Sequence, residues 1–292
     1  TMTPDLITKY DARVPRYTSY PTAPHFHAGV DGQRYGQWLA DLDSDTDLSL
    51  YIHVPFCDTL CWFCGCLTTV VNRPEPIQHY MGYLLKEIDR VAAYLGDTRR
   101  VTHVHMGGGS PTILSPDQLH TLFERLRTHF TFTDDAEIAI EVDPRGFKES
   151  TVDALAEIGL TRASIGVQDL DPEVQKAVNR IQPYETTRDA VEMLRARGVN
   201  GLNIDLMYGL PHQTAAGTVE TVQRLLALGP DRMALFGYAH VPWMKKHQRL
   251  ISEDDLPNAQ QRLAQFDRAS ETLRENGYVP IGLDHFAHPR DP

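Results

Sequence analysis

Cysteine is scarce in this sequence of 292 residues. The only four cysteines lie close together, at Cys57, Cys61, Cys64 and Cys66. A disulfide framework would spread cysteines along the chain to close long loops, so bridges inside such a short window would stabilise little. A structural zinc site usually adds a second, distant pair of ligands, and only histidine pairs such as His25 with His27 or His103 with His105 are available for that role. We expect those histidines on surface loops and strand faces, so the cysteine window needs another explanation.

Long apolar runs and an excess of positive charge are also missing. No stretch approaches the roughly 18 apolar residues of a membrane span, and charged residues interrupt the start of the chain. Lys and Arg number 28 against 39 Asp and Glu, a formal net charge of −11, which disfavours nucleic acid as a partner. With 41% hydrophobic residues the chain is able to bury a core. We therefore expect a folded, monomeric, cytoplasmic protein with no membrane or nucleic-acid partner.

The spacing Cys57-x3-Cys61-x2-Cys64 indicates an iron–sulfur cluster. Soft thiolates select iron clusters, and one loop is able to wrap a cubane. Phe63 and the tryptophan before it are apolar groups that limit access of solvent and oxygen. Three thiolates leave one iron of a four-iron cluster without a protein ligand. Cys66 is a possible fourth ligand, and the spacing alone does not decide between the two arrangements.

Segments whose apolar residues have the period of a strand alternate along the chain with segments whose apolar residues have the period of a helix. Strands are expected at 48–54, 101–106, 137–142, 163–167, 202–207, 232–237 and 278–283. Helices are expected at 77–95, 150–158, 172–178, 186–197, 216–228 and 258–276. Glycines at 159, 198, 229 and 277 follow helices where a left-handed cap is needed. This alternation predicts an α/β fold of parallel strands and crossover helices, an open or closed barrel over residues 48–292, with residues 1–47 as an extension that wraps it.

Glycines and polar residues follow the expected strands at their carboxyl ends, where barrels carry their active sites. The first strand runs into the cysteine loop and the second into the glycine run 107–109. The next four end at Glu141, Gln168, Asp205 and Ala239. The glycine run matches neither a Walker loop nor a dinucleotide fingerprint. Because three glycines exceed what one turn demands, we expect them to let bare backbone approach a ligand.

Some of these residues have a plain structural interpretation as well. Glu141 and Asp205 are able to accept hydrogen bonds from ribose hydroxyls or to pair with an amine, but either one alone is equally well explained as a helix cap or a solvated charge. Gln168 and Arg180 carry weaker signals, since a surface arginine on a helix is normally solvated. Tyr51 and His53 alternate along the first strand and are expected in the core.

The motifs and their order resemble the radical S-adenosylmethionine enzymes, and among them the oxygen-independent coproporphyrinogen III oxidases. The segments that carry the resemblance run through nearly the whole chain: Pro15–Pro21, Leu50–Cys57, Cys61–Cys66, Ile140–Arg145, Gly166–Asp169, Asn203–Pro211 and Gly282–Ala287. The resemblance implies a partial (β/α)6 barrel. It also implies a mostly helical C-terminal domain in family members, which we expect to be absent from this chain.

The resemblance implies a role for each matching residue. Cys57, Cys61 and Cys64 would ligate a [4Fe–4S] cluster and leave its fourth iron for S-adenosylmethionine. Cys66 matches a family cysteine that does not ligate the cluster but is tied to activity, which implies a catalytic role for it. Four residues match positions around the cluster-bound S-adenosylmethionine: Tyr51, Phe63, Gly108 and Glu141. Six match the site of a second molecule of it: Gly109, Ser110 (where Thr is commoner), Gln168, Arg180, Asp205 and Ala239.

The implied activity is the conversion of two propionate side chains of coproporphyrinogen III to vinyl groups, which yields protoporphyrinogen IX in haem biosynthesis. A 5′-deoxyadenosyl radical would remove a hydrogen from each propionate, and CO2 and one electron would then leave. Electron donor and acceptor are unidentified. Because the substrate carries four carboxylates and the chain is acidic, we hypothesise a carboxylate clamp at Arg13 or Arg16.

Two other functions stay open. One is a haem chaperone of the same superfamily without decarboxylase activity, against which Cys66 and the segment Pro15–Pro21 argue. The other is an electron carrier whose cluster has four cysteine ligands.

Overall fold

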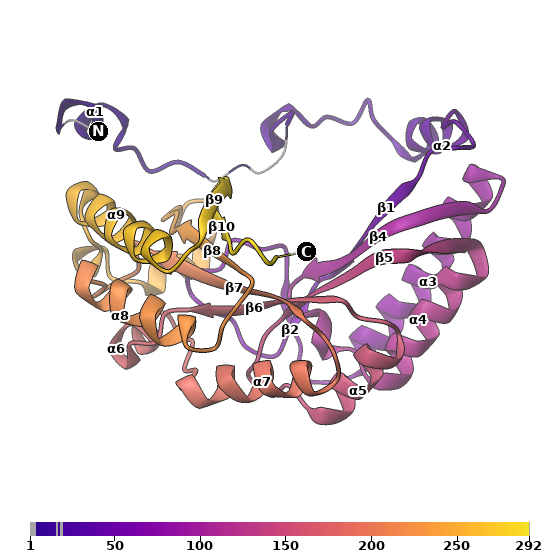
Figure 1. Ribbon diagram of the computed structural model, residues 1–292. Coiled ribbons are helices and arrows are strands. Elements are labelled where there is room, and N and C mark those ends of the chain that lie inside the picture. Colours follow the sequence, from indigo (N-terminus) through magenta and orange to yellow (C-terminus); the bar gives the residue numbers. More distant parts are fainter. Residues whose placement is uncertain (1–3, 16, 18–19, 292) are drawn as a thin grey trace.

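A curved eight-stranded sheet forms the centre of the molecule (Figure 1). The computed structural model describes residues 4–15, 17 and 20–291. The strand order is β1-β4-β5-β6-β7-β8-β10-β9. Six strands run parallel to one another: β1 (Leu48–Val54), β4 (Arg99–Gly108), β5 (Phe130–Val142), β6 (Arg162–Gln168), β7 (Gly201–Tyr208) and β8 (Arg232–Gly237). The two others are antiparallel: β10 (His285–Ala287) and β9 (Val279–Gly282).

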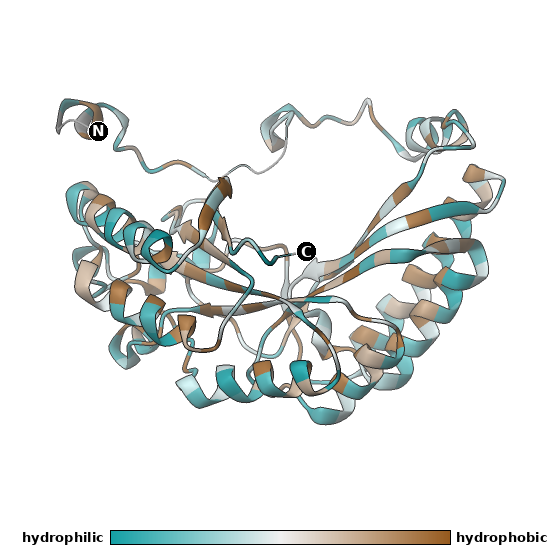
Figure 2. Cartoon of the chain, in the orientation of Figure 1, coloured by the Kyte–Doolittle hydropathy of each residue, from teal (hydrophilic) through white to brown (hydrophobic). Residues whose placement is uncertain are grey.

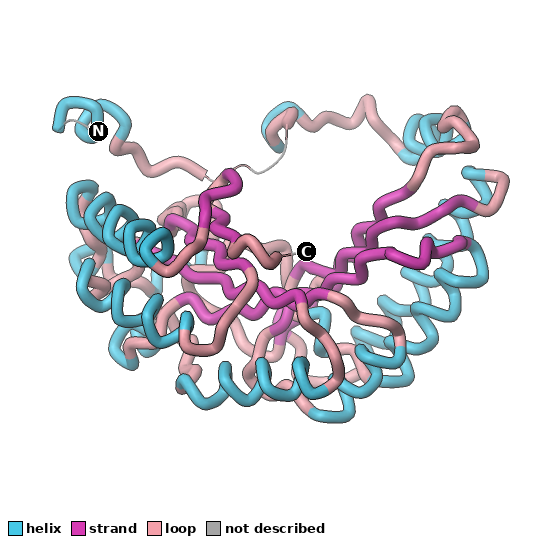
Figure 3. The backbone as a smooth tube through the Cα atoms, viewed as in Figure 1, coloured by secondary structure: helices cyan, strands magenta, loops and turns pink. Residues whose placement is uncertain are grey.

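Helices cover the outer, convex side of this sheet (Figure 3). Those of the barrel are α3 (Glu75–Leu95), α4 (Pro116–His129), α5 (Glu149–Glu157), α6 (Pro172–Ala177), α7 (Tyr184–Ala196), α8 (Ala215–Leu226) and α9 (Ala259–Glu275). Each outer helix carries hydrophobic and hydrophilic residues along its length (Figure 2), as expected where one side only is buried. In α3 the buried side chains recur at helical spacing: Ile77, Met81, Leu84, Ile88 and Leu95. Among the described residues no helix is both long and apolar enough to cross a membrane.

Strand alternation separates the core of the protein from the concave side of the sheet. Successive side chains of a strand point to opposite faces. In β7, Leu202, Ile204 and Leu206 belong to the buried core, whereas Asp205 and Met207 line a cavity. In β6 the same division holds: Ala163, Ile165 and Val167 are in the core, and Ser164, Gly166 and Gln168 line the cavity. The period of two therefore decides which residues of each strand are available to a ligand.

The predicted α/β architecture is confirmed, and three local expectations differ from the structure. Helix α4 was not expected, although Ser115 and Gln118 form a capping box at its start. Strand β5 begins at Phe130, earlier than predicted. The last segment is not one parallel strand but a hairpin, because positive φ angles at Leu283 (33°) and Asp284 (69°) reverse the chain. The left-handed glycines at 159, 198, 229 and 277 are as predicted.

The segment before β1 contains two helices, α1 (Pro4–Tyr10) and α2 (Gly32–Ala40), and a 3-10 turn at Ala23–His25. Helix α1 contacts α9, and α2 packs against α3, so this segment reaches both ends of the sheet (Figure 1). Pro15, Tyr17 and Ala23 line the cavity on the concave side. A domain boundary at residue 47 stays a prediction.

Candidate cofactor-binding site

A cavity of about 560 Å³ lies at the carboxyl ends of the parallel strands, a volume typical of sites for small molecules and cofactors. The residues that line it come from the cysteine loop, the glycine run and strands β5 to β8. Most of the predicted site residues are among them: Cys57, Cys61, Phe63, Cys64, Cys66, Gly108, Gly109, Glu141, Gln168, Arg180, Asp205 and Ala239. The structure thus brings together residues that lie up to 182 positions apart, from Cys57 to Ala239.

The cysteine loop, residues 55–71, is fixed by backbone hydrogen bonds at its base. It opens with β2 (Phe56–Cys57) and closes with β3 (Thr69–Val70), which pair in parallel. The amide of Thr69 donates to the carbonyl of Pro55 at 2.8 Å. On its far side, Trp62 N–H donates to Val178 O (2.9 Å), and Asn179 Nδ2 donates to Leu60 O (2.9 Å). These bonds anchor the loop at its base and again near its middle.

The glycine run is required by close packing against the cysteine loop. A Cβ on Gly109 would lie 2.5 Å from the carbonyl oxygen of Phe56, closer than real contacts allow. The Gly109 amide donates to Val54 O (2.8 Å), the Ser110 amide to Phe56 O (2.7 Å), and the Gly108 amide to Glu141 Oε2 (3.1 Å). The amides of the glycine run at Gly108 and Gly109 are thus already bonded, to Glu141 and to Val54 O, and the approach of this backbone to a ligand stays a prediction.

A second clamp on the cysteine loop comes from the turn Lys245–Leu250, which the sequence analysis missed. Three side chains of this turn bond to carbonyls of the loop. Gln248 Nε2 donates to Phe63 O at 3.0 Å, Lys245 Nζ donates to Cys66 O at 3.1 Å, and His247 Nε2 lies 2.7 Å from Cys64 O. Residues Lys246–Leu250 form a 3-10 helix, which is too short to show a periodic pattern, so spacing gave no signal for it.

All four cysteines are free thiols. Burial raises the pKa of Cys57, whose sulfur lies 3.2 Å from Thr68 Oγ1. A hydrogen bond from the Cys66 side chain lowers the pKa of Cys64 to about 6, and the same bond raises the pKa of Cys66. The cysteine loop therefore favours a thiolate at Cys64, the form in which cysteine binds metal.

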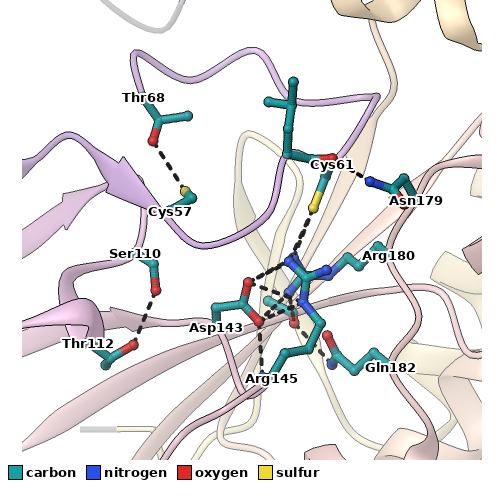
Figure 4. A network of polar contacts seen from close by, with 12 residues as sticks. Cys57, Cys61, Thr68, Ser110, Thr112, Asp143, Arg145, Asn179, Arg180 and Gln182 are labelled. Carbon is teal, nitrogen blue, oxygen red and sulfur yellow. Dashed lines mark hydrogen bonds and ion pairs between the residues drawn. The ribbon is translucent and has the colours of Figure 1, made fainter. Parts of the chain in front are cut away.

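Cys61 is buried beside two guanidinium groups (Figure 4). Arg145 Nη2 lies 3.3 Å and Arg180 Nη1 3.4 Å from its sulfur. Asp143 bonds to both arginines. Burial alone would raise the pKa of Asp143, but the hydrogen bonds from Arg145 and the charges of Arg180 and Arg145 together outweigh burial and lower the pKa. These contacts place two guanidinium groups within hydrogen-bond distance of the Cys61 sulfur.

The two carboxylates predicted at strand ends are both part of the cavity wall. Glu141 bonds to the Gly108 amide and lies 3.5 Å from His105 Nε2. Asp205 accepts hydrogen bonds from Ser164 Oγ (2.9 Å) and Asn203 Nδ2 (2.7 Å). Burial raises the pKa of Asp205 to about 6. Neither carboxylate caps a helix, so the interpretation of these residues as helix caps was wrong.

Tyr51 and Ser110 lie outside the cavity lining. The Tyr51 side chain was expected in the core, and this prediction was wrong, because the residue is 60% exposed. Its ring stacks on His105 at 5.9 Å, and its hydroxyl bonds to His53 Nδ1. Ser110 is buried, with its hydroxyl 3.2 Å from Thr112 Oγ1 (Figure 4).

On the other side of the cavity, the chain turns sharply at Gln168, which has a φ of 72°. Arg180 is not a solvated surface residue, since it is 7% exposed and donates to Gly166 O at 2.6 Å. Gln182 donates to the same carbonyl. His240, which follows Ala239, faces a separate cavity of about 400 Å³ and bonds to Tyr238.

The residues present fit a [4Fe–4S] cluster with an organic ligand. Three thiols of one loop line the cavity, and thiolates are the ligands of such clusters. Two buried polar atoms have no protein partner among the residues described: Nε of Arg180, which lines the cavity, and Oδ1 of Asn203, whose Nδ2 bonds to the cavity residues Ser164 and Asp205. Within the same part of the chain, no three His, Cys, Asp or Glu side chains converge closely enough to hold a single metal ion.

Residues 51–225 match the family model of the Radical SAM superfamily, and the chain belongs to that superfamily. Its cofactors are accordingly a [4Fe–4S] cluster and S-adenosylmethionine.

Similar proteins carry a more particular name. Oxygen-independent coproporphyrinogen III oxidase of Bradyrhizobium diazoefficiens is 49% identical over 99% of this chain and 65% of its own length. The protein of that name from Pseudomonas aeruginosa is 45% identical, with 98% of this chain and 63% of its own length covered. The solved structure of coproporphyrinogen III oxidase (HemN) from Escherichia coli, a radical SAM enzyme, aligns with a TM-score of 0.90 at 41% identity, over 98% of this chain and 64% of that one. The chain thus spans slightly less than two thirds of these relatives.

Proposed function

We propose that this chain is the catalytic barrel of an oxygen-independent coproporphyrinogen III oxidase. Such an enzyme converts two propionate groups of coproporphyrinogen III to vinyl groups, with release of CO2, in haem biosynthesis. One observation carries the proposal: the three loop cysteines and the polar side chains of β5 to β8 line a single cavity. The similarity to relatives of that name over nearly the whole chain supports it.

The cysteine loop would hold the cluster through Cys57, Cys61 and Cys64. When bound, the cluster and S-adenosylmethionine supply a 5′-deoxyadenosyl radical that abstracts hydrogen from the substrate. The chain's own residues orient these groups and exclude water. Apolar side chains such as Phe63, Met207 and Val241 line the cavity for the second purpose. The exposed Cys66 would contribute to turnover without ligating the cluster.

Residues at the strand ends are suited to bind S-adenosylmethionine. Glu141 and Asp205 present carboxylate oxygens, which accept hydrogen bonds from ribose hydroxyls or an ammonium group. Arg180 presents a buried cation for a carboxylate. We keep two molecules of S-adenosylmethionine as the proposed stoichiometry, with Tyr51, Phe63, Gly108 and Glu141 around the first. The second would contact Gly109, Ser110, Gln168, Arg180, Asp205 and Ala239.

The substrate carboxylates need local cations in this acidic chain. Arg13 already pairs with Glu253 at 2.6 Å, so a substrate carboxylate there would have to exchange this partner. Arg16, like Thr18 and Ser19 of the same motif, lies outside the described residues. Lys245 lines the cavity and is the cation that we favour.

The four free cysteines support a reducing compartment, and we propose the cytoplasm. The monomeric state stays a prediction.

The test is anaerobic reconstitution with iron and sulfide, followed by reaction with coproporphyrinogen III, S-adenosylmethionine and a low-potential reductant. We expect products with one or two vinyl groups by chromatography, and none from a Cys61→Ala variant. Arg125→Gln, which removes a surface ion pair with Asp89, is the control that should keep the product.

Each rival function has its own signature in the same experiment. A four-cysteine electron carrier would show an EPR signal of the reduced cluster that S-adenosylmethionine leaves unchanged. A haem chaperone would bind haem stoichiometrically and form no vinyl product. Either result would overturn the proposal.

A further inference from the structure

We propose that Arg145 tunes the reduction potential of the cluster by a hydrogen bond to the sulfur of Cys61. This inference rests on the proposed cluster ligands. Arg145 has no role in the site predicted from the sequence, yet its guanidinium lines the cavity and its Nη2 lies 3.3 Å from Cys61 Sγ (Figure 4).

The position of the Arg145 side chain is fixed by Asp143, two residues earlier on the turn after β5. Nε donates to Asp143 Oδ1 at 3.0 Å, and Nη2 donates to Oδ2 at 2.6 Å. The backbone amide of Arg145 donates to the same carboxylate at 3.0 Å. A bidentate pair of this kind fixes the plane of a guanidinium as well as its distance. The Nη2 group is thereby directed at Cys61 before any cluster is bound.

The three thiols differ in the partners that they meet. Cys57 Sγ lies against the Thr68 hydroxyl at 3.2 Å. Cys64 Sγ accepts from the backbone amide of Cys66 at 3.4 Å. Those hydrogen-bonding partners are neutral, although Lys245 also acts on Cys64 electrostatically. The charged groups that bond to a sulfur directly are those of Arg145 and Arg180, at Cys61. With Asp143 counted, the group around Cys61 carries one positive charge in excess.

This arrangement favours the reduced cluster. Reduction adds one electron, so negative charge on the cluster and its thiolates increases. Hydrogen bonds to the sulfurs, nearby charge and burial are the protein's means of setting the potential. The side chain of Cys61 is buried, so the charged donors act in a medium of low dielectric, where their effect is large. Removal of the Arg145 guanidinium should therefore make the cluster harder to reduce.

The test is a redox titration of the reconstituted protein, with the reduced cluster counted by EPR. Titanium(III) citrate supplies the electron, one per cluster, and is itself oxidised to titanium(IV). In Arg145→Gln we expect the equilibrium constant for reduction to fall at least tenfold, a shift of about 59 mV for a one-electron couple. Arg145→Lys keeps the positive charge but lacks the planar guanidinium that donates to Asp143 and Cys61 at once. The reduction potential of its cluster should therefore lie between that of the Gln variant and that of the parent.

Iron and sulfide per chain are measured first, so that a change of potential is not confused with loss of the cluster. Arg125→Gln is the matched control, because it also removes an arginine paired with an aspartate, at 2.6 Å, but on α4. Its potential should equal that of the parent. A fully loaded Arg145→Gln variant with the parent's potential would overturn the proposal.

If the Arg145→Gln variant does not bind the cluster, the Arg145→Lys variant is used for the test. An Arg145→Lys variant with the parent's reduction potential would also overturn the proposal. Failure of both to load while the control loads would show that Arg145 serves assembly and not tuning, which also overturns the proposal. The two proposals of this article fail separately. A shifted potential without any porphyrin product would contradict the proposed function alone, whereas a parent protein that binds no cluster would contradict the cluster site itself.

Discussion

The two halves of the cavity rim are held in different ways. The first half, residues 55–71 and 107–112, is joined by bonds between backbone groups, such as Gly109 N–H to Val54 O and Val71 N–H to Cys57 O. The second half, residues 164–182, 203–213 and 236–248, depends on side chains. Buried glutamines join its segments, with Gln213 bonded to Asp169 and Gln182 to Gly166 O.

The difference follows from what each half must hold. In the first half, backbone groups bond to each other directly, so the segments must approach closely and tolerate little change of shape. Because such bonds need no side chains, this half carries little charge beyond its thiols. Side-chain networks place carboxylates and amides where a polar ligand needs them, at the cost of buried groups that are sensitive to pH. The first half should therefore be sensitive to steric changes, and the second to the deprotonation of buried carboxyl groups such as Asp205 as pH rises.

The largest effect is expected from loss of a cluster ligand in the first half. Cys61→Ala should lower iron content roughly tenfold or more, because even loss of a supporting group typically costs ~10- to 100-fold in metal affinity. Cys66→Ala should keep its iron, since three thiolates suffice. Iron and sulfide assays after reconstitution measure both. Equal losses in the two variants would favour a four-cysteine cluster.

A methyl group in the glycine run should distort the first half. Gly109→Ala places a Cβ 2.5 Å from Phe56 O and from Thr68 Oγ1, so the cysteine loop must move, at a cost of about 3 kcal/mol. Gly65→Ala in the same loop is the control, because its Cβ would meet no atom within 4 Å. Urea unfolding compares them, and equal stability of the two variants would show that the close approach is not required.

The second half should respond to pH through Asp205. Its pKa is raised from 3.8 to about 6 by burial, so the folded state holds the proton more tightly than the unfolded state does. The resulting stabilisation is present below about pH 4 and is lost as pH rises through 6. Relative to the parent, Asp205→Asn should gain about 2 kcal/mol between pH 4.5 and 7.5 by urea unfolding. Asp135→Asn, at an exposed position, should show no such trend.

The smallest effect is expected at the ion pair Arg13–Glu253, which joins the N-terminal segment to the chain just beyond the second half. Arg13 and Glu253 are both about half exposed, and exposed pairs contribute about 0–1 kcal/mol. Arg13→Ala should change the unfolding free energy by less than about 1 kcal/mol. A larger loss would mean that the segment is a tightly held part of the rim. A weaker affinity for coproporphyrinogen III would instead support the hypothesised carboxylate clamp.

Much of the site followed from the sequence because alternation and parallel pairing fix where strand ends lie. Gln168 and Asp205 were found in this way, since the ends of β6 and β7 meet at one edge of the sheet. Arg145 and Gln248 were missed because they lie on turns, whose path depends on tertiary contacts and not on a period. Helix α4 is a different case, because the capping box at Ser115 was readable from the sequence.

The cysteine loop shows a further limit of spacing. The pattern Cys57-x3-Cys61-x2-Cys64 predicts a cluster, but it contains nothing about the partners of each sulfur. Arg145 was part of a recognised motif, yet its contact with Cys61 joins positions 84 residues apart. Such a contact is fixed by the fold as a whole.

Within the described ranges, the central sheet does not close into a ring, since β1 forms one edge and β9 the other. In a closed barrel the number of strands and their stagger determine the radius. An open sheet has no such fixed circumference, because the distance between its edge strands depends on how the twist of neighbouring strands adds up. A small change of twist at each strand pair widens or narrows the aperture without breaking a ladder hydrogen bond. The distance between the two edge strands is therefore free to vary in this architecture, and the segments that bridge the two edges determine its value.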